Sequence, residues 1–158
     1  MSAIKNNLWK IFFSTFLLLI FSSCTSEEKK NSNLPEEIDY IILSNVGGKS
    51  GNYRIIKIKK DSIHLEKGAA AKQNHQEKGL AISHATWKKL VSTVDIKNLD
   101  LIESSPSKQS VDGIDETFQI KTTKKSHVYV NAYNDSIHYK QLQNMKTELE
   151  KILPKEYK

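Results

Sequence analysis

The chain has 158 residues, a length typical of one domain, and a formal net charge of +6. The basic excess is almost wholly lysine, since Arg54 is the only arginine, and proteins that read nucleic acids use arginine for bidentate contacts. The single cysteine, Cys24, excludes an intramolecular disulfide and a cysteine zinc cluster. We therefore expect a lysine-rich solvated surface and no nucleic-acid partner.

The N-terminus has the pattern of an export signal. Lys5 and Lys10 make a basic segment without acids, and an apolar run follows from Ile11 to Phe21. As a helix this run would span about 17 Å, well short of the ~30 Å hydrocarbon core of a bilayer. The sequence therefore predicts a signal peptide over residues 1–23 rather than a membrane-spanning helix.

The end of the apolar run, Phe21-Ser22-Ser23-Cys24, resembles the lipobox of bacterial lipoproteins, with Phe21 where that motif usually has leucine. The resemblance implies cleavage after Ser23, a diacylglycerol on the sulfur of Cys24 and, often, N-acylation. Two or three acyl chains anchor a protein firmly, because each buried methylene contributes about 0.8 kcal/mol. Thr25 in place of aspartate after the cysteine implies sorting to the outer membrane. An ordinary secretory signal with a chance cysteine is the alternative.

Residues 25–37 are polar and cannot bury a core, which predicts a flexible tether with a mean span of about 20 Å. Ser26-Glu27-Glu28 resembles the short acidic tags that direct some Gram-negative lipoproteins to the cell surface. The periplasmic side and the cell surface both stay open as the location of the protein. The remaining residues, 38–158, predict a single globular domain.

The first half of this domain alternates in the way that strands do. We predict strands over Ile38–Ser44, over Tyr53–Lys59 and over Ile63–Glu66. Both faces of the first strand are largely apolar, which places it in the middle of a sheet or under two layers. Between the first two, Asn45–Asn52 contains three glycines, but it lacks the spacing of a phosphate loop and precedes a strand. We interpret it as a hairpin loop. Residues 68–79 have no clear period and predict a surface loop, with room for a short strand at residues 80–82.

The second half adds two helices and a hairpin. Apolar residues at i, i+3, i+4 and i+7 predict a helix over His84–Val94, and Ser83 is its expected N-cap. Strands are expected over Thr117–Thr123 and His127–Tyr133, after a loop over residues 103–113. A C-terminal helix is predicted from an apolar stripe that Pro154 closes; its members are Leu142, Met145, Leu149, Ile152 and Leu153.

These elements predict an α+β fold: an antiparallel sheet of about five strands with two helices packed on one face, a two-layer sandwich. The layout, the Gly-Gly…Gly-x-Tyr first hairpin and Asp115 before Thr117-Phe118-Gln119-Ile120 resemble an uncharacterised domain of small bacterial lipoproteins. The resemblance covers roughly residues 38–153 and implies no activity.

Few residues favour chemistry. None of the five histidines has HxxxH or HxH spacing, so we interpret each as a surface or edge residue, and we assign no catalytic motif, metal set or cofactor. The Asp112–Glu116 segment offers oxygen ligands for a cation but lacks the pattern of an EF-hand loop. His127, Tyr129 and Tyr133 are expected to face outward, where they could form a recognition strip.

Two hypotheses follow. The first is a membrane-anchored envelope lipoprotein that is not an enzyme and whose open sheet face or glycine loop contacts an envelope protein; its oligomeric state stays open. A purely structural spacing role would look the same. The second is an envelope metal-dependent hydrolase that uses the Asp112–Glu116 loop together with a histidine.

Overall fold

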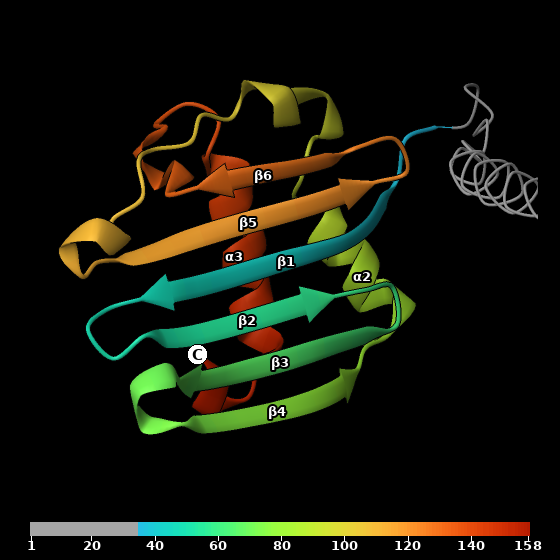
Figure 1. The fold of residues 1–158 in the computed structure, drawn as a ribbon. Helices are drawn as coiled ribbons and strands as arrows, with labels where there is room; N and C mark the ends of the chain where they lie inside the picture. The colour runs from blue at the N-terminus through green and yellow to red at the C-terminus, as the bar shows by residue number, and fades with distance from the viewer. Residues whose placement is uncertain (1–34) are drawn as a thin grey trace, which may run out of the picture. The chain divides into compact units, whose positions relative to one another are not determined.

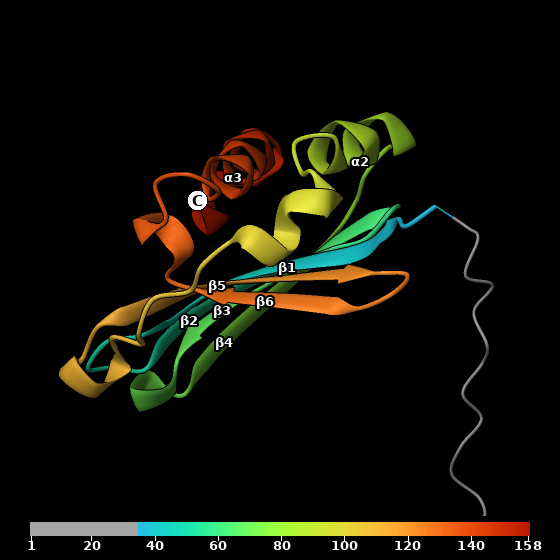
Figure 2. The same ribbon diagram turned by 90° about the horizontal axis from the view of Figure 1, so that it is seen from above.

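Six antiparallel strands form one sheet in the computed structural model, which describes residues 35–158 (Figure 1). The strands lie in the order β4-β3-β2-β1-β5-β6, and both helices, α2 and α3, cover the same face (Figure 2). The bounds are β1 Ile38–Gly47, β2 Asn52–Ile58, β3 Ser62–Ala69, β4 Asn74–Ala81, α2 His84–Val91, β5 Ile114–Thr122, β6 Ser126–Val130 and α3 Lys140–Ile152. The α+β class and the helical layer are thus confirmed, whereas the sheet has six strands rather than about five.

The additional strand is β4, most of which falls in the segment predicted as a surface loop, so that prediction was wrong. All eight residues of β4 pair with β3, from Asn74 opposite Ala69 to Ala81 opposite Ser62. Seven of the eight are exposed, and β4 is an edge strand of the sheet. A strand with polar residues on both faces lacks the alternation that marks a half-buried strand.

The prediction that the first strand lies inside the sheet is confirmed. β1 pairs with β2 on one side and with β5 on the other. Ile41 lies opposite Ile58 of β2 and opposite Ile120 of β5, and the pairing continues on both sides to Gly47. Ile41 and Leu43 face the helices and are fully buried. Alternate residues of β1 lie on the opposite face, which neither α2 nor α3 covers (Figure 2).

The helices close the core as the apolar stripes predict. The Ser83 hydroxyl accepts a hydrogen bond from the backbone of Thr86, and Trp87 and Leu90 of α2 are buried. Each such side chain stabilises the fold by roughly 1.5–3 kcal/mol. The helix ends at Val91, three residues earlier than expected. From α3 and its end, Leu142, Met145, Leu149 and Leu153 complete the core, while Ile152 stays 37 % exposed.

Candidate functional site

Five polar side chains form a row across the helix-covered face of the sheet. Strand register places Gln76 opposite Lys67, Lys67 opposite Arg54, Arg54 opposite Asn45, and Asn45 opposite Glu116. We call these five residues the polar row. Because side chains alternate between faces, each member of the polar row other than Gln76 shares its face with a core residue two positions away in its own strand. Those core residues are Leu65, Ile56, Leu43 and Phe118.

The basic half of the polar row binds the C-terminal segment of the domain. Arg54 donates one hydrogen bond to the backbone oxygen of Tyr157 and another to the side-chain oxygen of Asn45, both at 3.0 Å. The ammonium of Lys67 donates to the backbone oxygen of Glu156 and lies 4.9 Å from the centre of the Tyr157 ring. These contacts hold the buried Tyr157 against the sheet.

The acidic half is a buried carboxylate with two donors. The Tyr139 hydroxyl donates to one oxygen of Glu116 at 2.7 Å, and the Lys146 ammonium donates to the other at 2.5 Å. Only 9 % of the Glu116 side chain is exposed, against 30 % for Lys146. Burial, together with the neighbouring carboxylate, raises the pKa of Tyr139. The hydroxyl therefore stays protonated and serves as a donor.

Two hollows open beside the polar row. The glutamate hollow, of about 530 Å³, lies over Asn45 and Glu116 and is bounded by α3. The basic hollow, of about 400 Å³, lies over Arg54 and Lys67. The hydrogen bond between Asn45 and Arg54 therefore joins the walls of the two hollows.

The Asp112–Glu116 segment is not the loop that the sequence predicts, because β5 begins at Ile114 and includes Asp115 and Glu116. The Asp115 carboxylate accepts hydrogen bonds from the backbone of Lys108 and from the Ser107 and Asn131 side chains. The Lys108 N–H is the largest cause of the lowered pKa of Asp115. Asp115 thus ties residues 107–108 to the sheet, while Glu116 points to α3. Within residues 35–158, no three His, Cys, Asp or Glu side chains are placed to hold a metal ion.

The glycine loop, Gly47–Gly51, is a hairpin loop, as predicted. Gly47, Gly48 and Gly51 all have positive φ, at 140°, 78° and 59°. The backbone N–H of Gly48 donates to the oxygen of Gly113 at 3.0 Å. The structure therefore brings the glycine loop beside the residues that precede β5, a proximity that the sequence does not reveal.

The predicted outward strip is wrong for two of its three members. His127 and Tyr129 face the helices and are buried, whereas Val128 between them is 55 % exposed. The Tyr129 ring can be buried because its hydroxyl donates to the backbone oxygen of Leu99 at 2.6 Å. Tyr133 is 38 % exposed, but it lies beyond the end of β6.

His127 is the histidine that least resembles a surface residue, which corrects the prediction made for it. Its Nδ1 lies 3.3 Å from a carboxylate oxygen of Asp100, and its buried Nε2 has no hydrogen-bond partner among the described residues. Burial, assisted by the nearby Lys125 charge, lowers the pKa of His127. His64, His75 and His84 are exposed, as expected.

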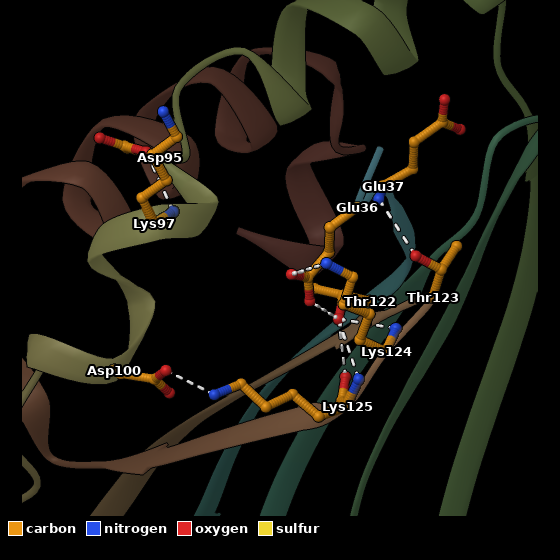
Figure 3. Close-up of polar contacts among 9 residues, drawn as sticks. All are labelled: Glu36, Glu37, Asp95, Lys97, Asp100, Thr122, Thr123, Lys124 and Lys125. Atoms are coloured by element: carbon orange, nitrogen blue, oxygen red, sulfur yellow. Dashed lines mark hydrogen bonds and ion pairs between the residues drawn. The ribbon is translucent and has the colours of Figure 1, made fainter. Parts of the chain in front are cut away.

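Where the chain enters the domain, acidic residues neutralise the lysines of the β5–β6 turn (Figure 3). Glu36 accepts a hydrogen bond from the Thr122 hydroxyl at 2.5 Å and lies 3.8 Å from the Lys124 ammonium. Lys125 pairs with Asp100. These contacts attach the start of the domain to the turn and leave little unbalanced charge there.

Cys24, the predicted lipid attachment site, and the predicted signal peptide lie outside the described residues. In the part of the chain that the structure describes, no helix combines the length and apolarity needed to cross a membrane. Neither the protein-family models nor the curated proteins gave any match to this sequence.

Proposed function

We propose that the protein is a membrane-anchored envelope lipoprotein that acts as a non-catalytic binding module. The lipobox-like segment before Cys24 supports the anchor, and the polar residues after it support a tether between lipid and domain. Glu36 and Glu37 bond to the β5–β6 turn, so the proposed tether ends before Glu36 rather than at residue 37. In this proposal the outer membrane holds the lipid, and the domain presents its far end to an envelope partner.

The observation that carries the binding role is the direction of β1. This strand of ten residues begins at Ile38, where the chain enters the domain, and ends at Gly47 (Figure 1). At about 3.3 Å per residue, β1 separates the two ends of the sheet by roughly 30 Å. The glycine loop therefore lies at the opposite end of the sheet from Ile38, and Asn45 of the polar row lies two residues before Gly47. An anchored domain would present this end away from the lipid.

The contacts of the polar row favour binding over catalysis. Both oxygens of Glu116 accept hydrogen bonds from donors of the fold, and Arg54 holds the C-terminal segment. A general base must lie within hydrogen-bond reach of the proton that it abstracts, and these contacts direct both Glu116 oxygens to Tyr139 and Lys146. Side chains that fix one another in this way instead make a rigid surface around the two hollows.

Fractionation of cells tests the anchor. Wild-type protein and the Cys24→Ala variant are expressed at equal level, and membrane and soluble fractions are compared after a high-salt wash. We expect the wild-type protein in the membrane fraction. Labelling with a radioactive fatty acid should mark the wild-type protein and should not mark the Cys24→Ala variant. Thr25→Ala is the matched control, because it leaves the cysteine and the preceding residues intact. Equal lipid labelling of wild type and Cys24→Ala would refute the proposed anchor.

A further inference from the structure

We propose that the basic hollow binds a phosphate-ester group, which rests on the binding role proposed above and names the ligand class. Four cationic side chains line this hollow of about 400 Å³, and one carboxylate side chain accompanies them. The cations are Arg54, Lys67, Lys72 and Lys158, and the carboxylate is that of Glu156. The hollow therefore has an excess of positive charge, which attracts an anion.

Two of these cations are fixed and two are free. Arg54 and Lys67 donate to backbone oxygens of the C-terminal segment, and a neutral carbonyl acceptor orients a charged side chain without cancelling its charge. The ammonium groups of Lys72 and Lys158 make no hydrogen bond or ion pair with another of the residues 35–158. Glu156 already pairs with Lys78 at 3.0 Å, outside the lining. Among residues 35–158, no carboxylate side chain therefore pairs with the ammonium group of Lys72 or of Lys158.

Neutral donors complete the lining. The side-chain amides of Asn52, Asn74 and Gln76 face the same hollow. The amide oxygen of Asn74 accepts a hydrogen bond from the backbone of Ala69 at 2.6 Å, so its NH₂ group remains available. A phosphate ester has several acceptor oxygens and up to two negative charges, and it matches a lining that is rich in donors and positive charge.

The glycine loop holds one wall of the hollow in place. A 3₁₀ turn, η1, spans Ala70–Lys72 between β3 and β4. The backbone N–H of Ala70 donates to the oxygen of Gly51, and that of Ala71 donates to the oxygen of Ser50, both at 3.1 Å. The loop that resembles a phosphate loop only in composition therefore has an indirect role: it positions Lys72.

The other lysine-rich end of the domain shows why charge alone does not define this site. At the β5–β6 turn, Lys124 lies near Glu36, and Lys125 pairs with Asp100. Solvated or paired lysines are the ordinary state of a lysine-rich surface. The basic hollow differs because its unpaired cations surround a concavity that also contains amide donors.

Isothermal titration of the full-length protein in neutral detergent with inorganic pyrophosphate tests this proposal. The double variant Lys72→Ala/Lys158→Ala removes the two free cations, and Lys140→Ala/Lys155→Ala makes the same change in net charge outside the hollow. Because each charge contributes on the order of a fivefold change at a solvated site, we expect affinity to fall at least about tenfold in the first variant. Affinity in the second should change by less than about twofold.

Two sources of the phosphate ester are distinguished by a second arm. Detergent micelles doped with phosphatidylglycerol or with phosphatidylcholine are added while amide NMR signals of residues 68–76 are followed. Shifts with phosphatidylglycerol alone identify an anionic headgroup, and shifts with pyrophosphate alone identify a soluble phosphate. If neither ligand shifts these signals, or if both double variants lose affinity equally, the proposal is wrong. Anchoring through Cys24 is measured separately, so its failure would not be confused with failure of this site.

Discussion

Removal of the Glu116 carboxylate tests the acidic half of the polar row. The Glu116→Ala variant leaves the buried Tyr139 hydroxyl without an acceptor and leaves Lys146 without its counter-ion. An unsatisfied buried polar group costs about 1–3 kcal/mol. The ion pair adds only about 0.5–1 kcal/mol, because 30 % of the Lys146 side chain is exposed to solvent. We expect the free energy of unfolding to fall by about 1.5–4 kcal/mol.

Urea denaturation of a protein comprising residues 25–158, followed by circular dichroism, measures this loss. A double-mutant cycle with Lys146→Ala isolates the ion pair, and we expect a coupling energy of about 0.5–1 kcal/mol. Lys140→Ala serves as the control for loss of a lysine from α3, since Lys140 is exposed. A loss below about 0.5 kcal/mol in Glu116→Ala would show that the carboxylate does not stabilise the fold.

Three further changes probe the fold. Gly47→Ala should destabilise the domain by more than about 2 kcal/mol in urea denaturation, because the added Cβ would lie 2.2 Å from a backbone oxygen at a residue whose φ is 140°. Gly79→Ala is the control and should change stability by less than about 0.5 kcal/mol, because its Cβ would meet nothing within 4 Å. Equal losses in the two variants would contradict the close approach at Gly47. Tyr129→Phe removes a buried donor to the Leu99 carbonyl and should lower the free energy of unfolding by about 1–2 kcal/mol, and an unchanged value would mean that this bond adds nothing. Burial lowers the pKa of His127, so the unfolded chain binds more protons than the folded domain as pH falls below about 6.5, and stability should decrease in that range. His127→Phe should reduce the difference in melting temperature between pH 7 and pH 5, and an undiminished difference would assign the effect to other groups.

The core elements were predictable because their patterns are local. Alternation in β1 and β2 and the stripe of α3, from Leu142 to Leu153, reflect the periods of strands and helices. β4 carries no such pattern, because seven of the eight residues of this edge strand are exposed on either face and only Leu80 packs against the core. Its place follows only from pairing with β3.

Strand β6 shows a different limit. The expected core face, with Val128 and Val130, is the outer one, and the aromatic face packs under the helical layer. In a five-residue strand with apolar atoms on both faces, alternation does not decide which face is inside. The decision depends on distant partners, such as the Leu99 carbonyl that accepts from Tyr129.

The polar row was not visible in the sequence. Alternation places Arg54 on the same face as Ile56 and Ile58, but the opposite face, with Tyr53, Ile55 and Lys57, has the same mixture, so the pattern does not show which face is buried. Strand register places Arg54 in one row with Lys67, Asn45 and Glu116, which belong to three other strands. Register is a property of pairing between strands, and a single sequence does not specify it.

Intact-mass spectrometry of the protein extracted from membranes of a Gram-negative host tests whether the domain is lipid-anchored. We expect a chain that begins at Cys24 and carries a diacylglycerol and an amide-linked acyl chain, with both modifications located on the N-terminal peptide. A mature chain with an unmodified Cys24 thiol, or one cleaved at another residue, would contradict this expectation.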